Sequence, residues 1–281
     1  MRLNAYVMIA DPSFLTASVS AYYPFVDRIV VSYDSRGLSW TGTPLPLDDG
    51  LARIRALDTE GKCDFRPGDF AREGFDPMDN DTFQRNDALA QASDGADWVL
   101  QLDTDEVLPR PDVFREVLRH ADESAAEGLE YPARWLYTRV GTERFLESCG
   151  ALWRTSSSYP GPVAVRAGTT LTHARQADVP LYRADVRPWN TDPSHQRDAV
   201  VHEVVARDAA IIHYSWVRSP EYIARKVGWS GHSEELRASG EYGRWLRARK
   251  RPVRTTLAAP FHRHGRRFRI VRAPAHLGQE S

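Results

Sequence analysis

Apolar and amphipathic stretches alternate through the first half of the chain. The apolar runs have the length and composition of strands buried on both faces, and they lie at 3–10, 27–33, near 63–65 and at 98–102. Helical patterns separate them at about 12–22, 47–57 and 81–93, the first of which begins with the start signal Asp11-Pro12. This alternation predicts an α/β protein with a mostly parallel sheet, right-handed crossovers and helices on the faces of the sheet.

The second half of the chain follows a different pattern. A helix is expected at about 111–120, and Ser219-Pro220-Glu221 is typical of a helix start. Between them lie shorter strand-like segments, several of them rich in Trp, Tyr and Arg, at 131–140, 151–153, 163–165, 200–205 and 210–216. We therefore expect a mixed extension of the sheet within one compact domain.

The apolar run at 98–102 ends in three acidic residues, Asp103, Asp105 and Glu106. In an extended chain Asp103 and Asp105 project to the same side, and two carboxylates held together repel unless a cation lies between them. Such a pair suits Mg²⁺ or Mn²⁺. A D-x-D triplet is more often a solvated turn or a helix cap, but this one follows a buried strand, where open α/β sheets bind their ligands. The motif therefore predicts a site for a metal and a phosphate.

Two further acidic residues follow the first two predicted strands. Asp11 comes after the first strand and Asp34 after the second, so their loops converge with that of Asp103 on one edge of the sheet. Ionised carboxylates accept hydrogen bonds from sugar hydroxyls in pairs, which favours a shared cleft for a sugar-containing ligand. The alternative roles are a helix cap for Asp11 and a turn residue for Asp34.

Composition narrows the class of protein. A chain of 281 residues with 42% hydrophobic positions can fill a sizeable core. It has no apolar run of about 18 residues and no basic start followed by an apolar stretch, so we expect a cytoplasmic protein without a membrane span or a secretion signal. Cys63 and Cys149 fit neither a disulfide framework nor a metal-ligand spacing, and we expect them to be reduced core residues.

The net charge of −1 conceals a basic C-terminal segment. Eleven Lys or Arg residues and no Asp or Glu lie between Tyr242 and Gln279. Such a segment favours an anionic partner, with a solvated helix and an arginine-rich terminus as the alternative. Apolar residues among the arginines favour peripheral contact with an anionic membrane over nucleic acid, and they are Trp245, Leu246, Leu257, Phe261 and Phe268.

The ordered motifs resemble family 2 glycosyltransferases. Gln84-Arg85-Asn86-Asp87-Ala88-Leu89, followed by the stretch from Asp97 to Glu106, is similar to the family signature of an (R/K)-N helix before a strand ending in D-x-D-E. His202-Glu203, Ile212-His213-Tyr214 and the Ser-Pro-Glu-Tyr helix start are similar to the bacterial branch that includes lipopolysaccharide-core glucosyltransferases. Together these matches extend from about residue 3 to about residue 235 in the expected order.

The resemblance implies a GT-A (Rossmann-like) fold, a UDP- or GDP-linked sugar donor, a glycan or glycolipid acceptor and a divalent cation, Mn²⁺ or Mg²⁺. By position, Asp105 and His213 would hold the metal. The donor-binding residues would be Asp103 at the ribose or a metal-bound water, Arg85 and Asn86 near the phosphates or the sugar, and Asp34 and Asp11 near the nucleoside. The insert from Ser35 to Pro46 replaces the family's usual short turn and leaves the residues that recognise the base open.

The implied reaction needs two kinds of assistance. The departing nucleoside diphosphate gains negative charge, which a metal stabilises as a Lewis acid, and the acceptor hydroxyl must lose a proton. Glu203 matches an acidic position near the acceptor and is the candidate general base, with Glu147 and Asp185 as alternatives. Direct displacement with one base would invert the anomeric centre.

The expected organisation is a glycosyltransferase domain at 1–240, with a donor half at 1–110 and an acceptor half at 111–240, followed by a basic helical tail at 241–281. Two other functions remain open. A nucleotidyltransferase acting on sugar phosphates would carry a glycine-rich basic loop where this chain has Ala10-Asp11-Pro12-Ser13-Phe14. A non-catalytic protein could instead bind anionic surfaces through the basic tail. The expected location is the cytoplasm, with peripheral contact at the inner face of the membrane, and no nucleic-acid partner is expected.

Overall fold

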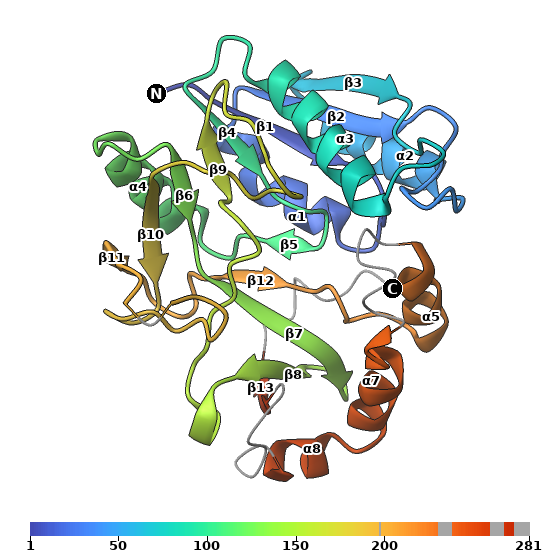
Figure 1. The fold of residues 1–281 in the computed structure, drawn as a ribbon, viewed down its shortest axis with the longest axis vertical. Helices are drawn as coiled ribbons and strands as arrows, with labels where there is room; N and C mark the ends of the chain where they lie inside the picture. The colour runs from blue at the N-terminus through green and yellow to red at the C-terminus, as the bar shows by residue number, and fades with distance from the viewer. Residues whose placement is uncertain (197, 230–237, 259–266, 273–281) are drawn as a thin grey trace.

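The computed structural model describes residues 1–196, 198–229, 238–258 and 267–272, and it contains a large, mostly parallel sheet flanked by helices (Figure 1). The strand order is β11-β10-β6-β9-β4-β1-β2-β3, and every strand except β9 runs in the same direction. The bounds are β1 Leu3–Met8, β2 Arg28–Asp34, β3 Cys63–Gly68, β4 Trp98–Gln101, β6 Gly128–Glu130, β9 Ala164–Arg166, β10 Leu181–Asp185 and β11 Glu203–Val204. The predicted α/β class is confirmed.

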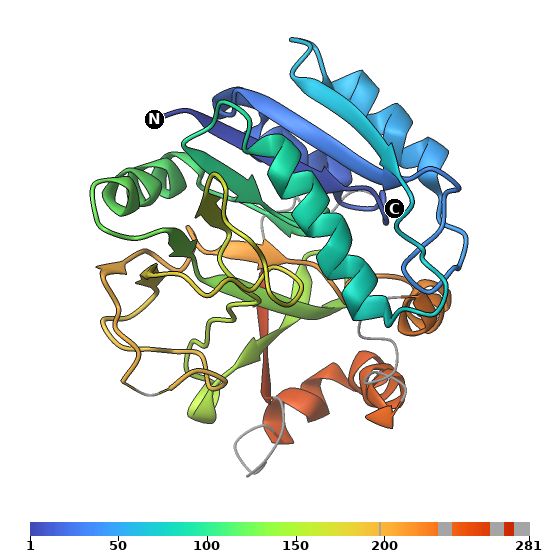
Figure 2. The same cartoon turned by 45° about the horizontal axis from the view of Figure 1, so that its top comes forward.

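Successive residues of β1 point to opposite faces of this sheet. Leu3, Ala5 and Val7 belong to one apolar cluster, whereas Tyr6 and Met8 belong to another. The first cluster also contains side chains of α1 (Leu15–Tyr22), α2 (Leu47–Leu57) and α4 (Pro111–Asp122), and the second contains side chains of α3 (Pro77–Ala92). Both faces of the sheet are therefore covered, which explains why its strands are apolar throughout (Figure 2).

A second sheet lies below the first in Figure 1, with the strand order β13-β8-β7-β12-β5. Its strands are β5 Glu106–Val107, β7 Ala133–Val140, β8 Arg144–Cys149, β12 Ile211–His213 and β13 Arg267–Arg272. Phe14, from the turn before α1, packs with Val107, Ile212 and Tyr214 of this sheet. Strand β5, which follows the turn after β4, meets a strand from more than one hundred residues later, since β12 pairs Ile212 with Val107 and His213 with Glu106.

The C-terminal helices pack on the second sheet. They are α5 (Pro220–Trp229), α7 (Glu241–Lys250) and α8 (Pro252–Ala258). Trp245 of α7 is fully buried, and its Nε1 donates hydrogen bonds to the carbonyl oxygens of Tyr137 and Trp216. Phe268 of β13 stacks on Tyr137 at a ring separation of 4.3 Å. The described residues after 240 therefore pack on the second sheet, so residue 240 does not separate two independently packed units.

This packing corrects the residues expected to contact a membrane. Trp245 and Phe268 are buried in the core, so they are not available to lipid, and Leu246 is partly buried against the same core. Leu257 remains 62% exposed, and Phe261 lies outside the described residues. No helix among the described residues is long and apolar enough to cross a membrane.

Several local expectations were wrong. The segment Ala151–Trp153 forms a 3₁₀ turn (η2) instead of a strand, and a second 3₁₀ turn (η1, Tyr23–Phe25) follows α1. Helix α1 begins at Leu15, so Asp11 does not cap it. Helix α3 begins earlier than predicted because Asp76 caps it by accepting a hydrogen bond from the amide of Met78. The predicted cap of α5 is confirmed, since the amide of Tyr222 donates to Oγ of Ser219.

Candidate functional site

The candidate site lies where the order of the parallel strands changes direction. Strands β2 and β3 follow β1 on one side, and the chain then returns to place β4 on the other side of β1. In open α/β sheets this arrangement leaves a crevice outside the carboxyl ends of the two central strands. Asp11 follows β1 and Asp103 follows β4, so both stand at that crevice.

The acidic motif after β4 forms a turn. The amide of Glu106 donates to the carbonyl oxygen of Asp103 at 3.0 Å, and Thr104 and Asp105 occupy the turn between them. The expected extended geometry, in which Asp103 and Asp105 would share a side by alternation, is therefore wrong. The turn allows Glu106 to start β5 opposite His213, and the amide of Tyr214 donates to the carbonyl oxygen of Asp105 at 2.8 Å.

Asp105 is surrounded by cationic side chains. Its Oδ1 lies 3.3 Å from Nε2 of His213, and its Oδ2 lies 3.2 Å from Nζ of Lys226 on α5 and 3.7 Å from Nη2 of Arg218. Burial raises the pKa of Asp105, but these cations more than offset that effect and hold the pKa well below its usual value. Burial lowers the pKa of His213, but Asp105 and Glu106 outweigh it and raise that pKa.

Asp103 and Asp11 each pair with an arginine. Nη2 of Arg85 lies 2.9 Å from Oδ1 of Asp103, and Nε of the same arginine lies 2.8 Å from Oδ1 of Asp81. Arg218 binds Oδ2 of Asp11 through Nε at 2.6 Å, and it also approaches Asp105. Nη1 of Arg85 is buried without a hydrogen-bond partner in this structure, and Tyr6 lies beside the same guanidinium.

Glu106 connects the acidic turn to the loop that contains Arg175. It is fully buried and forms a bidentate ion pair with Arg175, whose Nη1 and Nη2 lie 2.5 and 2.6 Å from its carboxylate oxygens. Nη1 of Arg175 also donates to the carbonyl oxygen of Gln101 at the end of β4. The arginine approaches Gly161 so closely that a Cβ there would lie 2.8 Å from its Cγ. We call Asp11, Asp103, Asp105 and Glu106 the carboxylate cluster.

Asp105 and His213 are the residues at this turn that could hold a metal. Oδ1 of Asp105 lies 3.3 Å from Nε2 of His213, and two adjacent ligands of an octahedral Mg²⁺ lie about 3.0 Å apart. The side chain of Asp103 keeps 34% of its surface exposed. Within the described part of the chain no group of three or more His, Cys, Asp or Glu residues is arranged to hold a metal, so Asp105 and His213 do not by themselves complete a metal site.

Lys226, Arg218 and Arg175 were not identified from the sequence. Arg218 follows His213 by five residues and Lys226 lies one helical turn before the end of α5, but basic residues at such positions are common. Arg175 belongs to a loop without a recognisable motif. Only the pairing of β12 with β5 and the closure of that loop on β4 bring these three side chains to the carboxylate cluster.

Asp34 organises two loops by accepting four backbone hydrogen bonds. Its Oδ1 accepts from the amides of Arg36 and Leu38, and its Oδ2 accepts from the amides of Phe70 and Ala71. Burial raises its pKa, but these four bonds more than offset the effect, so the pKa is lowered. The structure thus gives Asp34 a turn-forming role and does not join it to the carboxylate cluster.

We expect Asp34→Asn to lower the free energy of unfolding by about 1–3 kcal/mol at pH 7, because an amide NH₂ cannot accept two of the four bonds. Since the folded-state pKa is lowered, the stabilising contribution of Asp34 is complete above the unfolded pKa of about 4 and is lost as the pH falls through the folded value. Urea denaturation from pH 7 to pH 2 should show the two proteins converging below about pH 4. A constant difference across this range would contradict the assignment.

The structure does not bring Asn86 or Glu203 to the carboxylate cluster. Asn86 binds the backbone of Leu171 through both ends of its amide, so it ties the loop after β9 to α3. Oε2 of Glu203 lies 2.9 Å from Nδ1 of His120 and 3.1 Å from the hydroxyl of Tyr182. Three strands separate β11 from β4, which corresponds to about 19 Å at the usual strand spacing.

The two alternative bases are also engaged elsewhere. Glu147 is buried beside Arg134, Arg207 and Arg269. Asp185 is fully buried and accepts hydrogen bonds from Val186, Thr191 and Ser157. Both carboxylates are therefore held by contacts within residues 134–269 and away from the carboxylate cluster.

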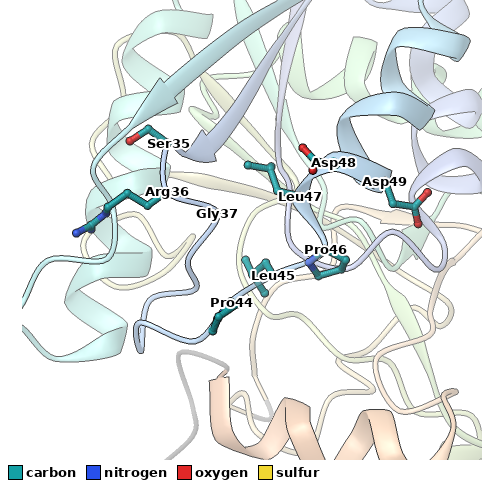
Figure 3. Close-up of a pocket in the computed structure, with 9 residues that line it drawn as sticks. All are labelled: Ser35, Arg36, Gly37, Pro44, Leu45, Pro46, Leu47, Asp48 and Asp49. Carbon is teal, nitrogen blue, oxygen red and sulfur yellow. The ribbon is translucent and has the colours of Figure 1, made fainter.

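A cavity of about 410 Å³ opens beside the loop that Asp34 organises (Figure 3). It lies between the end of β2 and the start of α2, and it includes both ends of the insert that replaced the expected short turn. Its size is in the range of small-ligand pockets. The lining residues are Ser35, Arg36, Gly37, Pro44, Leu45, Pro46, Leu47, Asp48 and Asp49.

No protein-family model and no curated protein matches this sequence. The chain is similar to a solved structure described as a mannose-1-phosphate geranyltransferase from Thermus thermophilus, at 16% identity and a TM-score of 0.32, over 60% of this chain and 51% of the other. A 4-diphosphocytidyl-2C-methyl-D-erythritol synthase from Anaerococcus prevotii aligns at 9% identity and a TM-score of 0.32, over 59% and 70% of the two chains. A mannose-6-phosphate isomerase from Helicobacter pylori aligns at 9% and 0.30, over 59% and 61%.

The chain thus spans about half the length of the first of these structures. At such low identities and TM-scores, the similarities carry no inference about substrate or reaction. The functional argument therefore rests on the residues of the candidate site.

Proposed function

We propose that this chain is a metal-dependent glycosyltransferase that moves a sugar from a nucleoside-diphosphate-sugar to a hydroxyl acceptor. The observation that carries the proposal is the Asp105–His213 pair at the switch point of the sheet, with Arg218 and Lys226 beside Asp105 and Arg85 on the neighbouring Asp103. Acidic and basic groups side by side suit a ligand that itself combines a divalent cation with a diphosphate.

The charge balance of the site supports this ligand. Five carboxylates, counting Asp81, are in contact with four Arg or Lys side chains, and His213 adds a positive charge when protonated. A divalent cation alone would add positive charge to a nearly balanced cluster. A diphosphate alone would add negative charge beside the carboxylates. Bound together they nearly cancel, so each should favour the binding of the other.

In this proposal Asp105 and His213 hold Mn²⁺ or Mg²⁺, and Asp103 contacts the ribose or a metal-bound water. A bound metal would stabilise the negative charge that develops on the departing diphosphate. Lys226 and Arg85 provide further positive charge for that diphosphate, and Arg218 keeps Asp11 and Asp105 in place. The cavity beside β2 is the proposed position of the nucleoside, and Asp34 acts there by shaping the wall.

A nucleotidyltransferase would need a different loop after β1. Such an enzyme binds a nucleoside triphosphate, and a glycine-rich loop after β1 would supply backbone N–H donors to it. The corresponding loop here contains Asp11, which is paired with Arg218, and it has no glycine. The glycosyltransferase is therefore the function that this geometry supports better.

Thermal unfolding with ligands tests the proposal, because a ligand that binds only the folded state raises Tm. We expect UDP or GDP with Mn²⁺ to raise Tm by more than the sum of the separate effects. Lys226→Met should weaken binding of the diphosphate with Mn²⁺ by about 10–100-fold, as expected for the loss of one charged contact. Arg225→Met, an exposed change on the same helix, is the matched control.

Two outcomes would contradict the proposal. If the increases in Tm caused by Mn²⁺ and by the diphosphate were simply additive, the two ligands would not favour each other's binding and the charge-balance argument would fail. A Tm increase with a nucleoside triphosphate and a sugar phosphate, but none with diphosphates, would favour the nucleotidyltransferase.

A further inference from the structure

Four large apolar side chains are exposed on two neighbouring elements far from the candidate site. Leu152 and Trp153 of η2 are 65% and 38% exposed, and Val253 and Leu257 of α8 are 59% and 62% exposed. The two elements are joined by a hydrogen bond of 3.0 Å from Nε1 of Trp153 to the carbonyl oxygen of Thr256. We call these four residues the η2–α8 surface.

The backbone of η2 holds its residues in an uncommon conformation. Leu152 and Trp153 have φ values of 53° and 56°, in the left-handed region that costs about 1–2 kcal/mol per residue for side chains other than glycine. Nη1 of Arg269 supports this turn by donating to the carbonyl oxygen of Trp153 at 3.0 Å. Leu152 gains no compensating burial, because its side chain remains in solvent. The turn therefore holds an apolar side chain at the surface.

Helix α8 adds apolar side chains beside this turn. Val253 and Leu257 are four residues apart, so they lie next to each other on one face of the helix. Helix α8 also packs on β13, which pairs with β8, and η2 follows β8 directly. The positions of both elements are therefore set by the same pair of strands, β8 and β13. In both views α8 lies at the end of the molecule remote from β1–β3 (Figures 1 and 2).

The segments that carry this surface are strongly basic. No Asp or Glu occurs between Glu147 and Asp178 or between Glu241 and Glu280. Among the described residues, exposed Lys and Arg side chains lie on α7, on α8, between these two helices and directly after η2: Arg154, Arg247, Arg249, Lys250, Arg251 and Arg254. Exposed leucine, valine and tryptophan side chains therefore share these segments with exposed positive charge.

We propose that the η2–α8 surface docks on the anionic face of a lipid bilayer. Apolar side chains that enter the headgroup region and cations that face acidic lipid together give reversible interfacial binding. Nucleic acid is a poorer partner, because Leu152, Val253 and Leu257 offer nothing to phosphates and only one aromatic ring is present for base stacking. The proposal replaces the buried Trp245 and Phe268 as the contact residues.

Cosedimentation of the full chain with vesicles tests the proposal. We expect binding to vesicles of phosphatidylcholine with phosphatidylglycerol, weaker binding to pure phosphatidylcholine, and loss of most binding between ~0.05 M and ~0.5 M salt. Leu152→Asn with Leu257→Gln should weaken binding to the anionic vesicles by about tenfold. Both residues are exposed and asparagine tolerates the left-handed conformation, so the fold should persist.

The matched control replaces two apolar residues that are equally exposed elsewhere, Phe75→Gln with Val200→Gln, and should change vesicle binding by less than about twofold. Equal binding of the wild-type chain to neutral and anionic vesicles would overturn the proposal, as would unchanged binding of the Leu152/Leu257 variant. Binding to single-stranded RNA without binding to vesicles would assign the surface to nucleic acid. A dimer in sedimentation equilibrium that the Leu152/Leu257 variant abolishes would assign it to a second copy of the chain.

Discussion

Asp105→Asn is expected to reduce metal-dependent hydrolysis or transfer of a UDP- or GDP-sugar by at least about 100-fold while the protein remains folded. The amide keeps the size of the side chain but removes the negative charge that faces His213, Lys226 and Arg218. Without that charge the site has an excess of positive side chains, so a divalent cation should bind much more weakly. Sugar release with Mn²⁺ in the presence and absence of an acceptor measures the loss.

The same change should also affect stability. Asp105 is buried and its pKa is lowered by its cationic neighbours, so its charge stabilises the folded state at neutral pH. We expect a decrease of about 1–3 kcal/mol in the free energy of unfolding, and circular dichroism should confirm that the variant is folded. Asp112→Asn removes an exposed carboxylate that is paired with Arg110 and serves as the control. Metal-dependent turnover within about threefold of wild type would disprove the role of Asp105.

Arg175→Met is expected to lower the free energy of unfolding by about 3–5 kcal/mol, the largest stability effect that we anticipate. It would leave the fully buried carboxylate of Glu106 without its two short ionic contacts, so that the His213 ring at 3.9 Å would be its remaining cationic neighbour when protonated. It would also release the loop that Arg175 holds against the carbonyl oxygen of Gln101. Urea denaturation with a two-state fit measures the difference.

Two further variants test whether stability depends on the Glu106–Arg175 pair itself and not on the loss of any one charged side chain. Glu106→Gln in the Arg175→Met background should recover part of the stability, since a neutral amide costs less to bury than an unpaired carboxylate. Arg119→Met removes an arginine that pairs with exposed Glu116 and Glu123, and it should cost less than about 1 kcal/mol. A cost below about 1 kcal/mol for Arg175→Met would show that the pair does not hold the site together.

These two predictions concern different properties of one short segment. Asp105 faces cationic side chains, whereas Glu106, the next residue, is fully buried and paired with Arg175. In the proposed function the turn after β4 would place Asp105 at the metal, with Glu106 as its support. A rigid support of this kind would keep Asp105 in position when charges are exchanged around it.

Local sequence determined the part of the fold that depends on neighbouring residues. The apolar strands β1, β2 and β4 and the helix α2 follow from runs and periodicities within a few residues, because burial on both faces of a parallel sheet requires a continuous apolar run. The D-x-D-E motif was recognisable for the same reason, since its position at the end of such a run is a local property. The α/β class of the protein follows from the order of these elements alone.

Tertiary structure decided which charged and apolar groups meet. Arg175, Arg218 and Lys226 come from segments about 70 to 120 residues beyond the acidic motif, and only the closure of the loop after β9 and the pairing of β12 with β5 bring them to it. The same long-range packing buries Trp245 and Phe268 and leaves Leu152 and Leu257 in solvent. Composition cannot distinguish these residues, because exposure depends on which element covers each side chain and not on its own hydrophobicity.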